Sequence, residues 1–408
     1  MNELPGRPAP QGASAGTEPY RVMVVDDSAV IRGLLTRSLE GNPEIKVVAS
    51  VANGQMAINT LQRQVIDVIV LDIEMPVLDG LSALPHLLAI DPHVKIVMAS
   101  TLTAKNADIS LRALKAGAAD YIPKPSSTRE LTSASDFKRE LTEKVKVLAQ
   151  AARRADPRKA GPQPGSSPAV PVARTGLATS APAPVTAQPT TSYTLPTLVR
   201  PKPEPAPITL RTVPDFRPDV LAIGSSTGGP QALFEVLSHL KDLKQPILIT
   251  QHMPATFTTI LAEHITRQCG IACTEAKDGE PIIGGHAYVA PGDFHMLVVQ
   301  KNGVNCLTLT KDPPENFCRP AVDPMLRSIV KAYGRRVLVT ILTGMGHDGQ
   351  RGSENVVQAG GAIIGQDEAS SVVWGMPGAV ATAGLCSAVL PLKEIGPYIR
   401  KLALRQAA

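Results

Sequence analysis

The chain has 408 residues, which is enough for two or three domains. Its 41 lysines and arginines against 36 aspartates and glutamates give a net charge of only +5, so charge alone does not indicate a nucleic-acid partner. The five cysteines are odd in number and form no pair of C-x-x-C units, which argues against a disulfide framework and a structural zinc site. No stretch approaches the roughly 18 to 20 apolar residues that cross a bilayer, and Met1 to Pro19 lacks the apolar core of a signal peptide. We therefore expect a cytoplasmic protein with no direct membrane insertion.

The first third of the chain alternates short apolar runs with helical patterns. Each apolar run is followed by a helix-like stretch, and such a strand–helix repeat predicts a parallel sheet with helices on both faces. The expected strands are residues 21–27, 46–50, 67–72, 95–100 and 120–122.

The carboxyl ends of these expected strands carry chemically active side chains. Asp26 and Asp27 end the first strand, Asp72 the third and Ser100 the fourth, and the fifth leads to Lys124. Because a parallel α/β sheet gathers functional groups at this edge, we expect these side chains to converge. Three carboxylates so close repel one another unless a divalent cation lies among them, and oxygen ligands suit Mg²⁺. Asp72 is the expected nucleophile toward phosphorus, with Lys124 offsetting the transferred charge and Ser100 hydrogen-bonding the new phosphoryl oxygens.

These residues together resemble the receiver domain of two-component response regulators. The run D-I-E-M-P-V-L-D-G, which begins at Asp72, extends the likeness beyond the separate residues. The resemblance implies a flavodoxin-like domain over residues 20–140, Mg²⁺ bound near the three carboxylates, and phosphorylation of Asp72 by a histidine kinase. It also assigns Ser100 and Lys124 to the switch that responds to the phosphoryl group.

Residues 151–214 differ in composition from both flanks. Prolines make up 14 of these 64 residues, mixed with alanine, serine and threonine, and Tyr193 is the one aromatic residue. Such a composition does not bury enough apolar surface to offset the entropy lost on ordering. We expect a flexible, disordered linker between two domains.

The strand pattern resumes after the linker, over residues 215–404. Residues 286–289 and 295–300 alternate like the two arms of a hairpin. The expected fold is a second doubly wound, Rossmann-like α/β domain with an antiparallel excursion. Aliphatic and β-branched runs predict its strands at residues 220–223, 246–250 and 337–342.

A turn of small residues, G-S-S-T-G-G-P, follows the first of these strands and precedes a helical pattern. A turn of this kind projects one hydroxyl and leaves backbone N–H groups bare at a helix N-terminus. Those are the ingredients of a nucleophile elbow, with Ser225 and Ser226 as adjacent candidates. Because glycine-rich turns also cradle phosphates, a nucleotide-binding effector is the alternative, although no lysine follows as in a P-loop.

A serine hydroxyl needs a base, and the base needs an orienting acid. Of the eight histidines, His252 directly ends a strongly apolar strand, which predicts that it lies on the same rim as Ser226, and His295 is the chief rival. The strand at 337–342 leads into T-G-M-G-H-D-G, where Asp348 lies among glycines that allow close backbone approach. We expect Asp348 to hold the imidazole of His252 in the useful tautomer.

Together these segments resemble the catalytic domain of the chemotaxis receptor protein-glutamate methylesterases, the CheB family. The matching stretches are, in chain order, I-G-S-S-T-G-G-P, Q-H-M-P, A-P-G-D-F-H-M, L-T-G-M-G-H-D-G and W-G-M-P-G. The resemblance implies a triad of Ser226, His252 and Asp348, backbone N–H groups of Met345 and Thr227 as oxyanion donors, and no metal in this half.

The same resemblance implies the reaction and the partners. The substrates are glutamate γ-methyl esters on methyl-accepting chemoreceptors, with deamidation of receptor glutamines as a further activity. The phosphodonor is a sensor histidine kinase of the chemotaxis type, and phosphorylation regulates the hydrolase. Two departures from the family pattern stand out, because Ser225 occupies the position of an expected small residue such as alanine, and His347 stands where asparagine is common.

A transcriptional response regulator is the competing reading from another class. It needs a compact basic helical module with a recognition helix. The second half is instead strand-rich and glycine-rich over about 190 residues. We therefore expect no nucleic-acid partner.

Overall fold

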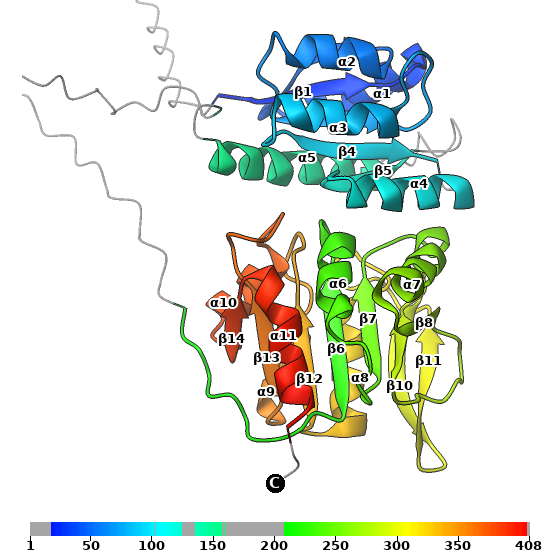
Figure 1. Cartoon of the computed structure of the whole chain (residues 1–408), viewed down its shortest axis with the longest axis vertical. Coiled ribbons are helices and arrows are strands. Elements are labelled where there is room, and N and C mark those ends of the chain that lie inside the picture. Colours follow the sequence, from blue (N-terminus) through cyan, green and yellow to red (C-terminus); the bar gives the residue numbers. More distant parts are fainter. Residues whose placement is uncertain (1–17, 102, 125–134, 157–158, 160–207, 406–408) are drawn as a thin grey trace, which may run out of the picture. The chain divides into compact units, whose positions relative to one another are not determined.

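The computed structural model describes residues 18–101, 103–124, 135–156, 159 and 208–405 (Figure 1). Two α/β domains are present in these ranges. Among the described helices, none has the length and apolar character needed to span a membrane.

The N-terminal domain is a five-stranded parallel sheet with the strand order β2-β1-β3-β4-β5. This is the flavodoxin-like order, so the predicted fold class is confirmed. Strands and helices alternate along the chain: β1 (Tyr20–Val25), α1 (Ala29–Glu40), β2 (Ile45–Val51), α2 (Gly54–Leu61), β3 (Val68–Asp72), α3 (Gly80–Ile90), β4 (Lys95–Ser100), α4 (Ala104–Lys115), β5 (Asp120–Pro123) and α5 (Ser135–Ala155).

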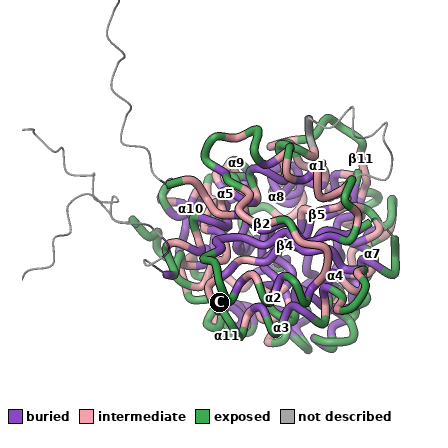
Figure 2. The backbone as a smooth tube through the Cα atoms, turned by 90° about the horizontal axis from the view of Figure 1, so that it is seen from above, coloured by how far each residue is buried: buried purple, intermediate pink, exposed green. Residues whose placement is uncertain are grey.

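Helices cover both faces of this sheet, with α1 and α5 packed together and α2, α3 and α4 following one another. The central strand β3, of sequence V-I-V-L-D, is therefore buried at every residue. Figure 2 shows buried stretches along inner strands such as β4 and exposed stretches on the outer helices. This double cover explains why the strands read as continuous apolar runs in the sequence.

The C-terminal domain has a seven-stranded sheet with the order β14-β13-β12-β6-β7-β9-β8, in which every neighbouring pair is parallel. Helices α6, α7 and α11 pack together, and α8 and α9 form a separate pair (Figure 1). Its elements are β6 (Val220–Ser225), α6 (Gly229–Ser238), β7 (Ile247–Gln251), α7 (Ala255–Cys269), β8 (Ala272–Glu275), β9 (His286–Val289), β10 (His295–Lys301), β11 (Val304–Thr310), α8 (Val322–Tyr333), β12 (Val337–Ile341), α9 (Gln350–Gln358), β13 (Ala362–Gln366), α10 (Met376–Thr382), β14 (Ala388–Leu390) and α11 (Leu392–Ala403).

The expected strands of both domains lie within two residues of the observed ends, but the predicted hairpin is wrong. Strand β9 does not pair with β10; it lies parallel between β7 and β8. Strand β10 pairs instead with β11. The turn between them contains Asn302 and Gly303, both with positive φ (51° and 78°), as a tight hairpin turn requires. Alternation indicates a half-buried strand but does not specify its partner, whereas the Asn-Gly pair did specify this turn.

The expected linker is shorter than 151–214 where the structure describes it. Residues 151–155 form the end of α5, and Ala152 is fully buried. At the other end, the Arg211 N–H donates to the Cys386 carbonyl at 2.9 Å, and Val213 packs against the hydrophobic core. Residues 157–158 and 160–207 of the expected linker lie outside the described residues.

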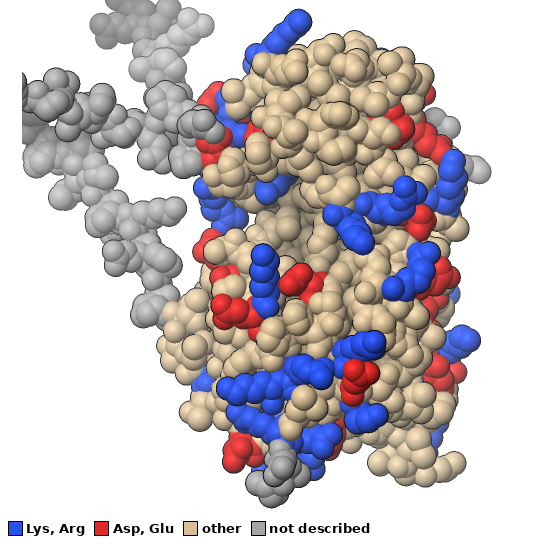
Figure 3. All heavy atoms as spheres, viewed as in Figure 1, with Lys and Arg blue, Asp and Glu red and all other residues tan. Residues whose placement is uncertain are grey.

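Charged side chains are mixed over the visible face of the C-terminal domain. Figure 3, in the view of Figure 1, shows lysines and arginines gathered around α11 with acidic side chains among them. Helix α11 carries Arg400 and Lys401 in its last turn and Glu394 in its first, the distribution that a helix dipole favours.

Candidate active site and phosphorylation site

The carboxyl edge of the N-terminal sheet gathers the predicted acidic residues around one lysine. Lys124 Nζ lies 2.5 Å from Asp26 Oδ2 and 2.6 Å from Asp72 Oδ1. Carboxylate oxygens of Asp26, Asp27 and Asp72 lie within 4.8 Å of one another. The sequence-predicted residues of this cluster are thus in one place, as the strand order β2-β1-β3-β4-β5 requires.

The donor set of this cluster fits a magnesium ion. When ionised, the three carboxylates exceed the one ammonium by two negative charges. Asp26 Oδ2 is buried and, among the described residues, receives no hydrogen bond besides its ion pair with Lys124. Burial raises the pKa of Asp72 above its ordinary value, Lys124 opposes this rise, and Asp26 adds to it. A hard divalent cation with oxygen ligands would offset the excess charge.

The D-G pair in the run after β3 has a steric cause. A Cβ on Gly80 would lie 1.9 Å from the carbonyl oxygen of Asp72, so only glycine fits there. Asp79 caps α3 by accepting from the Ser82 N–H at 2.8 Å. The close return of the chain holds the loop against the end of β3 and keeps Asp72 at the rim.

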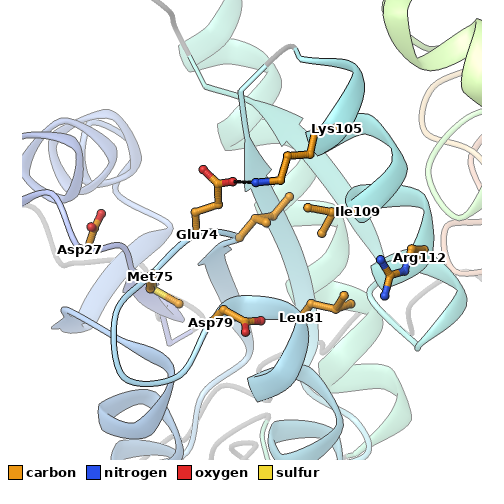
Figure 4. Close-up of a pocket in the computed structure, with 9 residues that line it drawn as sticks. Asp27, Glu74, Met75, Asp79, Leu81, Lys105, Ile109 and Arg112 are labelled. Atoms are coloured by element: carbon orange, nitrogen blue, oxygen red, sulfur yellow. Dashed lines mark hydrogen bonds and ion pairs between the residues drawn. The ribbon is translucent and has the colours of Figure 1, made fainter.

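Ser100 and an open pocket flank the acidic cluster. Ser100 is buried at the end of β4, and its hydroxyl accepts a hydrogen bond from Ser110 of α4 at 3.1 Å. A surface pocket of about 590 Å³ has Asp27 in its lining, together with an exposed ion pair between Glu74 and Lys105 at 2.8 Å. Figure 4 shows these side chains around the pocket. Because Asp27 belongs to both features, the pocket opens beside the acidic cluster.

In the C-terminal domain, three adjacent strands bring the predicted catalytic residues to one rim. Strands β12, β6 and β7 are neighbours in the sheet. Ser226 follows β6 directly, His252 follows β7 directly, and Asp348 lies in the loop between β12 and α9. The backbone N–H of His252 also donates to the Ser225 carbonyl at 3.1 Å, which fixes the loop after β7 against the loop after β6.

His252 and Asp348 form a direct hydrogen bond. His252 Nε2 lies 2.7 Å from Asp348 Oδ2, and because a carboxylate only accepts, the ring proton belongs on Nε2. Asp348 is buried and accepts four further hydrogen bonds, from the Asn316 side chain and from the backbone N–H groups of Val322, Asp323 and Gly349. Although burial raises it, the hydrogen bond and charge of His252, with help from the backbone N–H groups, hold the pKa of Asp348 below its ordinary value.

The two adjacent serines have different environments. Ser225 is fully buried, and its hydroxyl donates to Gln251 Oε1 at 2.7 Å. Gln251 in turn donates to the carbonyls of Ser226 and His252 at 3.0 and 3.2 Å. Ser226 is half-buried. The hydroxyl of Ser225 is therefore committed to holding two loops together, and that of Ser226 is the accessible one.

The loop after β12 approaches Ser226 closely. A Cβ on Gly344 would lie 2.9 Å from the Cβ of Ser226 and 2.4 Å from the Met376 sulfur. In the described part of the chain, the backbone N–H groups of Met345 and Thr227 donate to no protein acceptor. Thr227 directly follows Ser226, and Met345 lies in the loop after β12. The backbone N–H of Ser226 donates to the Thr343 carbonyl at 3.0 Å and holds that loop beside Ser226.

The second nitrogen of His252 meets a thiol rather than the serine hydroxyl. Nδ1 lies 3.4 Å from Cys318 Sγ. Among the described residues, no hydrogen bond of 3.5 Å or less joins Ser226 Oγ to His252. Burial lowers the pKa of His252, but the charge of Cys318 and the hydrogen bond that His252 donates to Asp348 outweigh it and raise this pKa to about 10.

The other histidines considered from sequence lie elsewhere. His295 is buried on β10, where its Nδ1 accepts from the Ala321 N–H at 3.2 Å and its Nε2 contacts the Pro313 carbonyl at 3.2 Å. Both nitrogens are thus used by the backbone, and His295 is a structural residue. His347 is exposed, although it directly precedes Asp348.

Sequence reasoning missed four residues around the three predicted catalytic residues. Asn316 donates to both Asp348 and Asp323, at 2.9 and 3.1 Å. Burial, together with the neighbouring Asp348, raises the pKa of Asp323. Gln251 and Cys318 complete the set. Gln251 precedes His252 in the Q-H-M-P motif and offered a signal, whereas Asn316, Cys318 and Asp323 reach the rim from a segment with no strand pattern.

Comparison with known proteins decides the family. Residues 221–399 match CheB methylesterase, and residues 22–136 match the response regulator receiver domain. A "Protein-glutamate methylesterase/protein-glutamine glutaminase of group 2 operon" from Rhodospirillum centenum is 75% identical over 409 residues, covering 100% of each chain. The chain belongs to the CheB methylesterase family.

Other members of the CheB family agree with this assignment. The protein-glutamate methylesterase/protein-glutamine glutaminase of Azospirillum brasilense is 64% identical over 414 residues, covering 99% of this chain and 98% of its own. The crystal structure of the Thermotoga maritima CheB methylesterase catalytic domain is 39% identical, with a TM-score of 0.45, and covers 45% of this chain and 98% of that one. The two family models and the full-length relatives confirm the predicted membership of the CheB family and the combination of a receiver with a methylesterase domain.

Proposed function

We propose that this chain is a phosphorylation-regulated serine hydrolase that demethylates glutamate γ-methyl esters of methyl-accepting chemoreceptors and deamidates receptor glutamines. The observation that carries the proposal is the hydrogen bond between His252 and Asp348 on the rim that also holds Ser226. The names of the relatives, protein-glutamate methylesterase/protein-glutamine glutaminase, support the two reactions, and membership of the CheB family supports chemoreceptors as the substrates.

In the proposed reaction, the Ser226 hydroxyl attacks the ester carbonyl. Since Asp348 occupies Nε2 of His252, the proton of Ser226 passes to Nδ1. The backbone N–H groups of Met345 and Thr227 donate to the tetrahedral oxyanion. His252 then returns the proton to the leaving methoxide, methanol departs, and water hydrolyses the acyl-enzyme to free the glutamate.

Deamidation follows the same course with ammonia as the leaving group. An amide carbonyl is a poorer electrophile than an ester carbonyl, and its leaving group must be protonated before it departs. We therefore expect the glutaminase rate to be lower than the esterase rate. The two activities share Ser226, so one substitution abolishes both.

Asp72 is the proposed phosphorylation site in the receiver. A sensor histidine kinase of the chemotaxis type is the proposed phosphodonor, and the pocket beside Asp27 offers an approach. Asp26, Asp27 and Asp72 would hold Mg²⁺, which supplies charge compensation for the transferred group. Lys124 then contacts the phosphorylated side chain, and Ser100 turns from Ser110 to a phosphoryl oxygen.

Methanol release from methylated receptor tests the hydrolase assignment. The Ser226→Ala variant of the full-length protein is expected to lose at least about a thousandfold in rate, because no nucleophile remains. Ser225→Ala is the matched control, since its hydroxyl donates to Gln251 and does not face the substrate. Equal losses in the two variants, or full activity in Ser226→Ala, would show that the nucleophile is wrongly assigned. Labelling by a serine-directed phosphonate separates this function from nucleotide binding.

Regulation is tested on the same full-length protein with a small phosphodonor and Mg²⁺. Phosphorylation is expected to raise the methanol-release rate of wild type and to leave that of Asp72→Asn unchanged. An equal response in both proteins would remove Asp72 from the proposal.

A further inference from the structure

A short turn brings a thiol to the free nitrogen of the proposed catalytic base. Cys318 Sγ lies 3.4 Å from Nδ1 of His252, the nitrogen left over by the hydrogen bond to Asp348. Cys318 is half-buried, whereas the other four cysteines are buried. The proposed hydrolysis has no use for a thiol at this point, so its position needs another explanation.

The turn holds Cys318 firmly against His252. Glu315 and Cys318 exchange two backbone hydrogen bonds, of 3.1 and 2.9 Å. The two residues between them, Asn316 and Phe317, both have left-handed backbone angles, with φ of 52° and 62°. Such angles are uncommon for a bulky side chain and are retained where the surroundings fix them.

Two side chains of this turn, both from residues that precede Cys318, anchor it to the domain. Asn316 donates to Asp348 at 2.9 Å. Glu315 forms an ion pair with Arg327 of α8. These contacts connect Asp348 to the turn that carries Cys318, and they hold Cys318 next to His252.

Cys318, His252 and Asp348 repeat the order of groups found in thiol enzymes, with a thiol, an imidazole and a carboxylate in hydrogen-bonding sequence. Nδ1 of His252 is a proton acceptor within reach of the Cys318 thiol, and the attack of a cysteine on an electrophile requires the loss of this proton. Burial raises the pKa of Cys269 to about 11 and that of Cys273 to about 12. Those two thiols are therefore poor nucleophiles at neutral pH.

The thiol also competes with the serine. Ser226 must deliver its proton to Nδ1 of His252, because Asp348 occupies Nε2, and Cys318 already stands at Nδ1. Because the sulfur already lies 3.4 Å from Nδ1, an atom added to it would crowd this side of the ring. It would keep the serine hydroxyl from its base.

We propose that Cys318 is a modification site for hydroperoxides and other soft electrophiles, and that its modification switches the hydrolase off at His252. With a hydroperoxide, a sulfur–oxygen bond forms as the oxygen–oxygen bond breaks. The sulfur is oxidised by two electrons to sulfenic acid and the peroxide is reduced. The thiol proton passes by way of Nδ1 of His252 to the departing hydroxide and gives water. A dithiol reductant reverses the step by reducing the sulfenic acid. The switch rests on the proposed function, whereas the reactivity of the thiol does not.

Two probes on the full-length protein test the switch, namely hydrogen peroxide and iodoacetamide, with which a sulfur–carbon bond forms and iodide leaves. Wild type is expected to lose at least about 90% of its methanol-release rate as peptide mass spectrometry shows Cys318 to be modified, and a dithiol should restore the peroxide-treated enzyme. Cys318→Ser should keep its own untreated rate under both probes. Cys306→Ser is the matched control, because it leaves Cys318 in place and should be inhibited like wild type. Full activity of wild type alkylated at Cys318, or equal inhibition of Cys318→Ser, overturns the switch.

A second readout, independent of hydrolysis, tests the thiol itself. Replacing the imidazole in His252→Gln is expected to slow alkylation of Cys318 at pH 7 by about tenfold or more, because the proton acceptor is gone. Equal labelling rates with and without the imidazole would refute the activation of Cys318. Absence of methanol release from untreated wild type would instead refute the proposed function, so the two failures are distinguishable.

Discussion

Replacing Asp348 by asparagine tests the geometry of the proposed triad, because every polar contact of this carboxylate is an accepted hydrogen bond. Oδ2 accepts from His252 and from the Val322 N–H, and Oδ1 accepts three more. Whichever way the asparagine amide turns, its NH2 group faces at least two donors. At about 1 to 3 kcal/mol for each buried donor left without an acceptor, Asp348→Asn should cost about 2 to 6 kcal/mol of unfolding free energy.

Asp348→Asn should also lower kcat, for a reason separate from its loss of unfolding free energy. An asparagine that turns its NH2 group toward Nε2 forces His252 into the wrong tautomer, and such a change lowers kcat by about 10⁴ in a serine protease. We expect a loss of about three to four orders of magnitude in methanol release at pH 7. The pKa of Asp348 lies below its ordinary value in the folded protein. Its ionisation therefore stabilises the wild type above about pH 4, and this contribution is lost as the pH falls.

Urea unfolding and initial-rate kinetics on the same preparations separate the two effects. Asp323→Asn is the matched control, since this neighbouring carboxylate accepts from Gly352 N–H and Asn316 but does not touch His252. It should lose stability and keep most of its kcat. The reasoning is refuted if a folded Asp348→Asn protein keeps kcat within about tenfold of wild type.

Three further perturbations follow from the described contacts. Gly344→Ala would place a Cβ 2.9 Å from the Cβ of Ser226. We therefore expect the free energy of unfolding in urea to fall by about 1 to 3 kcal/mol and phosphonate labelling of Ser226 to slow. Unchanged labelling would contradict the close approach. The pKa of His252 is raised to about 10, so its charged form stabilises the fold fully below about pH 6.5 and this stability is lost as the pH rises toward 10. Over the same interval the neutral base appears, so kcat should rise with pH; Cys318→Ser should shift this rise to lower pH, and coincident pH–kcat profiles would remove Cys318 as a cause. Chelation of divalent cations should reduce phosphorylation of Asp72 by a small phosphodonor to background, measured by gel mobility shift, since its cluster carries excess negative charge; undiminished phosphorylation would argue against the metal site.

Residues that lie at strand ends were predictable because chain direction in a parallel sheet is fixed. Asp72 and Ser226 each follow a run of aliphatic residues, and such a run places its last residue at the carboxyl edge. The same pattern placed His252 at this edge, but it did not exclude His295 as the catalytic base. The backbone contacts of both His295 ring nitrogens excluded it. The hairpin failed because alternation is a property of one strand, while pairing depends on which strand edge is free.

The sequence alone determined the order of strands and helices, the separation into two α/β domains, the acidic cluster with Lys124, and the three strand tips of the proposed triad. These features depend on local periodicity and on motifs of a few residues, so they survive without coordinates. The tertiary structure alone decided which serine hydroxyl is accessible, which strand pairs with β10, and that Asn316 and Cys318 meet Asp348 and His252. Asn316 and Cys318 lie 32 and 66 positions from their partners, in a turn that has no periodic sequence pattern. Only the packing of α8 and its preceding turn against the sheet rim brings them together.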